Sequence, residues 1–193
     1  FSLLVGGRLD KHNKISGVVF NPRATVRYTP IDAIGLRASY SSGYRAPQAY
    51  DEDLHVAAVG GNVSIITIDP DLKPEYSHSI NASVDLYKTF GSIQANLLIE
   101  GFYTDIKDVF TLEENGTDAN GNLLWERRNT SGSVVKGVNL EAKVGFTSKL
   151  VLDAGYTIQS SRYKEVFRWS DDVDPQRKMF RAPDQYGYLT VNY

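Results

Sequence analysis

The chain has 193 residues, 41% of them apolar, which is enough for one folded domain and too apolar for a disordered chain. Its formal net charge of −2 excludes the basic surface with which proteins bind nucleic acids. The absence of cysteine excludes disulfides and thiolate metal sites, and no apolar run approaches the roughly 18 residues of a transmembrane helix. The 12 tyrosines favour strands and surfaces where apolar material meets water.

Apolar and polar residues alternate along most of the chain, and helical periodicity is nearly absent. Between Ser79 and Leu86 every second residue is apolar, and the same alternation recurs around Val26, Leu140 and Leu152. A period of two places all these apolar side chains on one face of a strand. The pattern predicts eight strands, at residues 1–10, 16–29, 34–44, 75–88, 92–114, 122–147, 149–165 and 184–193.

The connections between these strands alternate between short and long, with an Asn-Gly pair at each end of the hairpin turn 115–121. Short turns on one rim and long loops on the other are typical of an outer-membrane barrel. The short connections are 29–35, 88–92 and 147–149, and the long ones are 43–75 and 164–183.

Two of the expected strands, 92–114 and 122–147, are much longer than the 9–11 residues that cross a bilayer. They should therefore project well beyond the membrane. Gly137 lies inside the second of them, and we expect a bulge or bend there.

The two faces of the strands differ in kind, because one is apolar with frequent aromatic residues and the other carries full charges. A transmembrane barrel would turn the apolar face to lipid, whereas a soluble β-sandwich or lectin-like carbohydrate-binding module would bury it under a second sheet. An enzyme is the least favoured class, because no catalytic constellation or cofactor motif is present. The charges on the polar face include Arg27, Arg37, Asp85, Glu141, Lys143 and Asp153.

Six segments, in this order along the chain, resemble the C-terminal barrel of TonB-dependent outer-membrane receptors. The sequence departs from the family pattern at Asp69, where the family has Asn, and at Asn139, where it has Glu. The matching segments are Asn21-Pro22-Arg23 with Tyr28-Thr29-Pro30, Gly43-Tyr44-Arg45-Ala46-Pro47, Asp69 to Glu75, Gly101 to Asp108, Gly137 to Glu141, and Arg181-Ala182-Pro183.

This resemblance implies an all-β, antiparallel, up-and-down transmembrane β-barrel fragment, with about eight long strands of a 22-stranded barrel. Residues 1–193 would be a partial barrel domain without its plug, truncated at both ends, in the outer membrane of a Gram-negative bacterium. The partners would be outer-membrane lipid and, through the plug, the TonB–ExbB–ExbD complex. The cargo would be a scarce ligand such as a ferric siderophore, haem or a corrinoid.

Loop 43–75 holds most of the candidate ligand-binding residues. Tyr44, Arg45 and Tyr50 could hold an anionic or aromatic ligand by a guanidinium fork and ring stacking. The resemblance gives the alternative that the Arg-Ala-Pro run anchors the strand to its loop.

An acidic cluster in the same loop, Asp51, Glu52 and His55, could capture a ligand or cation with oxygen donors and an imidazole. The alternative is a solvated loop, or the cap of a short helical turn. Arg168 and Trp169 in loop 164–183 could line the ligand vestibule, or belong to a hydrated surface. The three histidines lack zinc-site spacing, so no resident metal is expected.

Eight strands taken from a wider barrel should not close into a tight ring. We expect an open sheet, or edges joined to another chain, because an unpaired strand edge is a template for pairing. Edge-to-edge self-association of the chain is therefore an expectation as well.

Overall fold

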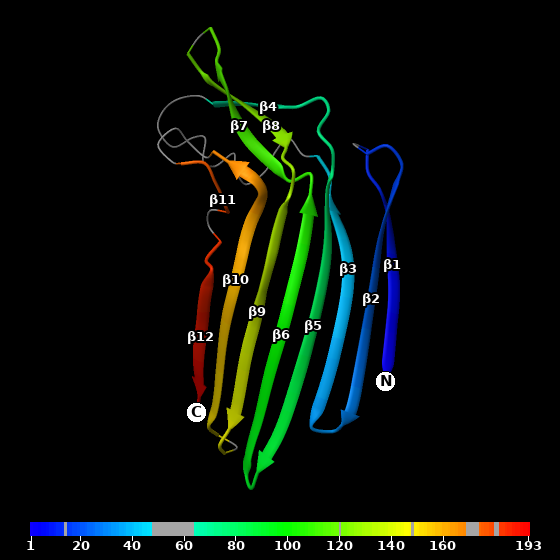
Figure 1. Cartoon of the computed structure of the whole chain (residues 1–193), viewed down its shortest axis with the longest axis vertical. Coiled ribbons are helices and arrows are strands. Elements are labelled where there is room, and N and C mark those ends of the chain that lie inside the picture. The colour runs from blue at the N-terminus through cyan, green and yellow to red at the C-terminus, as the bar shows by residue number, and fades with distance from the viewer. Residues whose placement is uncertain (14, 48–63, 120, 148, 169–173, 180–181) are drawn as a thin grey trace.

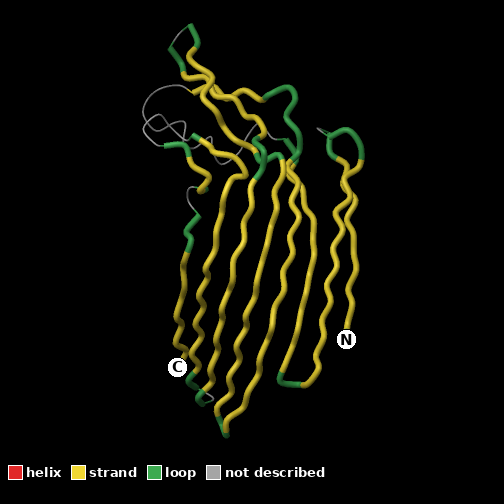
Figure 2. Tube along the Cα trace, viewed as in Figure 1, coloured by secondary structure: helices red, strands yellow, loops and turns green. Residues whose placement is uncertain are grey.

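The computed structural model describes residues 1–13, 15–47, 64–119, 121–147, 149–168, 174–179 and 182–193 (Figure 1). All regular structure in these ranges is β-strand (Figure 2), and none of it is a helix that could span a membrane. The strands are β1 (Ser2–Lys11), β2 (Val18–Ile31), β3 (Ile34–Arg45), β4 (Ser64–Ile68), β5 (Glu75–Phe90), β6 (Ile93–Lys107), β7 (Phe110–Thr117), β8 (Leu123–Asn129), β9 (Ser133–Gly145), β10 (Val151–Phe167), β11 (Gln176–Lys178) and β12 (Gln185–Asn192).

Nine strands form one large antiparallel sheet in the order β1-β2-β3-β5-β6-β9-β10-β11, with β12 also paired to β10. The short turns β2–β3, β5–β6 and β9–β10 lie at one end of the strands, and the longer connections lie at the other (Figure 1). Within the described residues β1 pairs only with β2, and β12 pairs only with β10. The sheet is therefore open, as expected, and the barrel is not closed in this chain.

One face of the large sheet is apolar across all of its long strands. The register aligns Leu36, Val84, Ile99, Leu140 and Tyr156 in one row, because directly paired residues point to the same side. Large apolar side chains on this face are exposed, and no second sheet covers them in the part of the chain that the structure describes. The β-sandwich alternative is therefore wrong.

Aromatic side chains border this apolar face at both ends. Tyr40 and Tyr103 lie towards the long loops, and Tyr28 and Phe90 lie towards the short turns. Tyr103 and Ile93 are ten residues apart on β6, about 34 Å at roughly 3.4 Å per residue. A strand tilt of about 40° reduces this to a height of about 26 Å, close to the apolar band of roughly 25 Å in outer-membrane barrels.

The opposite face is polar, and the burial of side chains on it indicates that it is the concave side of the sheet. Its side chains form a cross-strand chain of hydrogen bonds, in which Asn139 donates to Glu100 (3.1 Å) and Thr157 donates to Asn139 (2.9 Å). Side chains on the inside of a curved sheet crowd together, whereas those on the outside spread apart. The buried side chains of the large sheet all lie on the polar face: Val19, Ser133, Thr157, Ser161 and Tyr163.

The two longest expected strands are each divided in the structure, which corrects the prediction. The run 92–114 becomes β6 and β7, and the run 122–147 becomes β8 and β9. The divisions lie side by side, at Asp108, which has a φ of 53°, and at Gly132, which has a φ of 110°. These left-handed residues turn the hairpin out of the large sheet, so that β7 and β8 project beyond its end (Figure 1).

The bulge expected at Gly137 is also wrong. Gly137 pairs in continuous register with Phe102 on β6 and Gln159 on β10. A Cβ at this position would lie 2.7 Å from the Phe102 ring and 2.4 Å from the carbonyl oxygen of Ile158. The glycine is therefore a place where an aromatic ring lies against bare backbone.

The projecting hairpin forms a second, three-stranded sheet in the order β4-β8-β7, in which β4 runs parallel to β8. Asn129, at the end of β8, connects this sheet to the preceding loop. Its side chain donates to the carbonyl oxygens of Lys73 (3.0 Å) and Asp108 (2.6 Å) and accepts from the Lys73 amide (2.7 Å). We call β4, β7, β8 and residues 69–75 the cap.

Candidate ligand-binding site

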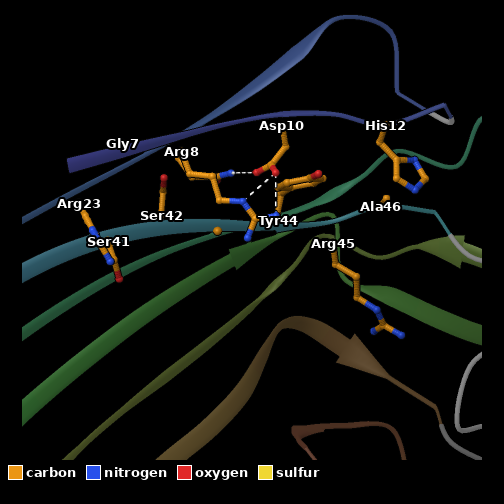
Figure 3. A pocket seen from close by; sticks show the side chains of 12 residues that line it. Gly7, Arg8, Asp10, His12, Arg23, Ser41, Ser42, Tyr44, Arg45 and Ala46 are labelled. Carbon is orange, nitrogen blue, oxygen red and sulfur yellow. Dashed lines mark hydrogen bonds and ion pairs between the residues drawn. The ribbon is translucent and has the colours of Figure 1, made fainter.

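A polar hollow of about 600 Å³ lies at the loop end of the polar face, over β1, β2 and β3 (Figure 3). It is broad and open rather than enclosed, as a vestibule above a barrel lumen would be. Its lining is Gly7, Arg8, Asp10, His12, Asn21, Arg23, Ser41, Ser42, Gly43, Tyr44, Arg45 and Ala46.

The alternation of β1 and β2 brings the charged part of this lining together. Arg8 pairs in register with Asn21, and Gly6 pairs with Arg23, so these polar side chains share one face. The intervening Leu9 points to the apolar face. The alternation of apolar and polar residues that forms the sheet therefore also places these charged side chains together in the hollow.

The charge in the hollow is predominantly positive. Arg8, Arg23 and Arg45 line the hollow together with one carboxylate, that of Asp10. Because Arg45 is also paired with the carboxylate of Glu75, the formal excess is one positive charge. Asp10 is already engaged, because Arg8 forms an ion pair with it at 2.7 Å and Asn21 donates to it at 3.3 Å (Figure 3). Guanidinium groups recognise carboxylate and phosphate oxygens by paired hydrogen bonds. The hollow is thus chemically suited to an anion.

Tyr44 and Arg45, both expected ligand residues, lie at the edge of this hollow. The guanidinium of Arg45 forms an ion pair with Glu75 at 3.6 Å and lies 5.2 Å from the centre of the Phe110 ring. The Phe110 amide donates to the same Glu75 carboxylate at 2.5 Å. Arg45 thereby joins the ends of β3 and β5 to the start of β7, which are the contacts of the anchoring alternative. Ligand binding by Tyr44 and Arg45 stays a prediction.

The other expected ligand residues are not brought to the hollow by the described chain. Arg168 is exposed at the end of β10, and β5, β6 and β9 separate that strand from β3. The remaining candidates lie outside the described residues: Tyr50, Asp51, Glu52, His55 and Trp169.

Sequence reasoning missed Arg8, Asp10 and Arg23 as candidate binding residues. Arg23 was noted only within a family motif, and β1 only as the first strand. The available signal was the position of these charges on the polar face at the loop end of the first hairpin. That signal depends on pairing β1 with β2 in the correct register, which the alternation alone does not supply.

The cap carries a second group of charges, around Arg128. Its guanidinium forms an ion pair with Glu126 and another with Glu113 at 3.3 Å. The hydrogen bond that Arg128 donates to Glu126 is the main cause that raises the pKa of Arg128 above its usual value, with the charges of Glu126 and Glu113 adding to it. Across the described ranges, no group of three or more His, Asp or Glu side chains could hold a metal ion.

Comparison with known proteins agrees with this architecture. The family model of the TonB-dependent receptor-like β-barrel matches residues 1–193. A comparison with curated protein sequences found no match.

Among solved structures, the siderophore receptor PirA from Pseudomonas aeruginosa is similar, with a TM-score of 0.67 and 19% identity over 82% of this chain and 31% of that one. PirA from Acinetobacter baumannii has a TM-score of 0.67 and 17% identity over 98% of this chain and 28% of that one. The FrpB iron transporter from Neisseria meningitidis has a TM-score of 0.55 and 23% identity over 76% of this chain and 20% of that one.

The chain thus spans less than a third of the length of these structures. At these identities the structures show a shared fold alone, and the proteins that have this fold are named as a siderophore receptor and an iron transporter. The open sheet has an exposed apolar band bordered by aromatic side chains on one face and polar side chains on the concave face. This is the form of one part of a transmembrane barrel. Since the family model covers every residue, the chain belongs to the TonB-dependent receptors, as a part of their β-barrel domain.

Proposed function

We propose that this chain is part of the wall of an outer-membrane receptor that imports a ferric siderophore with energy delivered by TonB. The observation that carries the proposal is the cationic hollow at the loop end of the concave face. Its cations lie on the side that a barrel turns to its lumen, at the end where cargo would arrive from outside the cell.

An anionic iron chelate fits this hollow better than a neutral solute does. Ferric siderophores hold iron through oxygen anions, and many keep a negative charge. Arg8 and Arg23 offer guanidinium donors in the open hollow, and Asn21 and Ser41 add neutral polar groups. The similar structures are those of a siderophore receptor and an iron transporter, which supports the same class of cargo here.

Haem and corrinoids remain cargo classes that the experiment must distinguish. Both carry carboxylate or phosphate groups that arginine could bind, but both also present a large flat macrocycle. The ring side chains in the described lining of the hollow are those of Tyr44 and His12, a small flat area for such a macrocycle. We therefore place the siderophore first, with the loop residues Tyr50, Asp51, Glu52, His55, Arg168 and Trp169 proposed as further contacts.

The proposed partners in the membrane follow from the same proposed receptor function. The apolar face contacts outer-membrane lipid, and the plug domain of the receptor contacts TonB and through it ExbB and ExbD. The open edges at β1 and β12 would pair with further strands of the same barrel. If the chain is refolded alone, we propose that those edges associate with other copies, giving oligomers in detergent by size-exclusion chromatography.

The test is growth of an iron-starved strain that carries the full-length receptor, supplied with one cargo at a time. Arg23→Gln should weaken cargo binding and uptake by roughly tenfold, because a hydrogen bond to a charged group contributes about 1.5–3 kcal/mol. Arg27→Gln is the matched control, since Arg27 lies on the same strand and face but four residues, about 14 Å, below Arg23. Equal effects of both variants, or growth on no iron chelate, would contradict the proposal.

A further inference from the structure

The apolar face ends abruptly at its loop-side border, on strands β6, β9 and β10. The row Gly101, Val138 and Ile158 is apolar, and the next row towards the loops is Tyr103, Lys136 and Ser160. One row further, Arg162 on β10 pairs with Val134 on β9 and with Lys178 on β11. This row also contains Asp105 on β6, which pairs with Val134. Charged side chains, most of them cations, therefore appear among the apolar ones within two rows, on the side of the sheet that faces away from the lumen.

Two of the cations at this border have carboxylate partners. Lys164 lies 2.5 Å from Asp105, and Lys178 lies 2.6 Å from Asp184.

Lys136 and Arg162 differ from these two, because the described ranges contain no carboxylate that pairs with either. The Nε of Arg162 donates to the Ser160 hydroxyl at 3.1 Å, which directs the guanidinium along the outer face. Lys136 pairs in register with Ser160, so Lys136 and Arg162 are diagonal neighbours, with backbones roughly 7–8 Å apart. A single anionic group between them could contact both.

A shallow apolar hollow of about 200 Å³ lies on the same three strands, below these cations. Leu140 in its lining is four residues from Lys136 on β9, about 14 Å along the strand. The lining combines large and small apolar side chains, so this part of the apolar face is uneven. The side chains that form it are mainly Leu97, Leu140, Ala142, Ala154 and Tyr156.

We propose that this outer surface binds one phosphorylated lipid of the outer leaflet. Its phosphate would lie between Lys136 and Arg162, and an acyl chain would occupy the hollow beside Leu140. Arginine matches two phosphate oxygens with its planar fork, and lysine adds a point charge. Basic side chains at the border of an apolar band attract anionic headgroups. The inference rests on the proposed outer-membrane location, because only a membrane supplies this ligand.

The charge distribution along the border favours a local site over a general attraction. At the same height on β3 and β5 the outward side chains include Tyr40 and His78, where the Tyr40 hydroxyl and the His78 ring form a 2.8 Å hydrogen bond. That part of the border is polar and aromatic but carries no lysine or arginine. A phosphorylated lipid should therefore occupy the β9–β10 side in preference to the β3–β5 side.

The experiment uses the full-length receptor, purified in mild detergent and titrated with diphosphorylated lipid A, its dephosphorylated form and phosphatidylethanolamine, with native mass spectrometry as the readout. The double variant Lys136→Gln with Arg162→Gln should bind the diphosphorylated lipid on the order of tenfold more weakly. The double variant Lys136→Arg with Arg162→Lys should retain binding. The charge-matched control is Lys143→Gln with Lys149→Gln, on the polar face and at the turn end, and should bind as the unmodified receptor does.

Retained heat-modifiable mobility on gels shows that each variant is folded. Equal binding of the dephosphorylated lipid, an equal loss in the control, or full displacement by millimolar inorganic phosphate would overturn the inference. Cargo uptake is measured on the same variants. Loss of lipid binding with normal uptake leaves the transport proposal intact, and lipid binding without uptake of any iron chelate removes the transport proposal alone.

Discussion

The large sheet and the cap depend on the sequence in different ways, because many residues determine the sheet and only a few determine the cap. Each long strand of the large sheet, here called the wall, repeats a two-residue pattern over ten or more positions, and its neighbours repeat the pattern in register. The cap depends on a few individual contacts, chiefly those of Asn129, Glu75 and the left-handed Gly132. A single substitution should therefore act on the wall according to the face it alters, and on the cap according to the contact it removes.

The largest effect should come from a charge placed on the apolar face. Leu140→Arg puts a guanidinium near the middle of the lipid-facing band and should destabilise the folded receptor by about 2–4 kcal/mol. The neighbouring Glu141→Arg puts the same charge on the polar face and should cost far less. Denaturant unfolding of the full-length receptor in lipid vesicles measures both, and equal costs would show that the two faces have been assigned incorrectly.

The next largest effect should come from the bend that separates wall from cap. An added Cβ at Gly132 would lie 2.3 Å from the carbonyl oxygen of Ile106, and its φ of 110° is unfavourable for any other residue. Gly132→Ala should therefore cost about 1–3 kcal/mol. Gly101→Ala is the control, because nothing lies within 4 Å of its added Cβ. Comparable unfolding midpoints for the two variants would contradict this account of the bend.

The alternation predicted the presence of the long strands well and the positions of their ends poorly, for a physical reason. A period of two is present wherever one face meets lipid and the other meets water, so residues such as Ile80, Val84 and Leu140 reveal the strand without knowledge of its neighbours. The end of a wall strand depends instead on a contact with a distant residue. Asn129 binds Lys73, which is 56 positions away, and no local pattern encodes that pairing.

The candidate site shows the same limit. Tyr44 and Arg45 were found because they follow a recognisable strand end, whereas Arg8 and Arg23 required the register of β1 with β2. The division of 92–114 was missed because a period of two resumes at Phe110 and Leu112 in the cap, although these residues are out of phase with Leu97 and Ile99 in the large sheet. A continuing pattern describes two faces, but it does not say whether they belong to the same sheet.

Within the cap, Asn129→Ala should release the loop 69–75 from β8. The variant loses three hydrogen bonds, those with the Lys73 amide and carbonyl and with the Asp108 carbonyl. We expect a local destabilisation of about 1–2 kcal/mol. Hydrogen exchange should accelerate in residues 69–75 and β4, while the exchange of β9 and β10 stays unchanged. Faster exchange throughout the wall would show that cap and wall unfold as one unit.

The smallest effect should come from the ion pair that joins the cap to the wall. Arg45 and Glu75 are 3.6 Å apart, and 41% of the Arg45 side chain is exposed, so the pair itself should contribute less than about 1 kcal/mol. Glu75→Gln removes the charge but keeps an oxygen for the Phe110 amide, whereas Glu75→Ala removes both. If the amide contact matters more than the charge, only the alanine variant should accelerate exchange at the start of β7. If the glutamine variant accelerates exchange to the same extent, the ion pair with the Arg45 guanidinium, and not the amide contact, connects the cap to the wall. The orientation of the hairpin would then depend on Arg45.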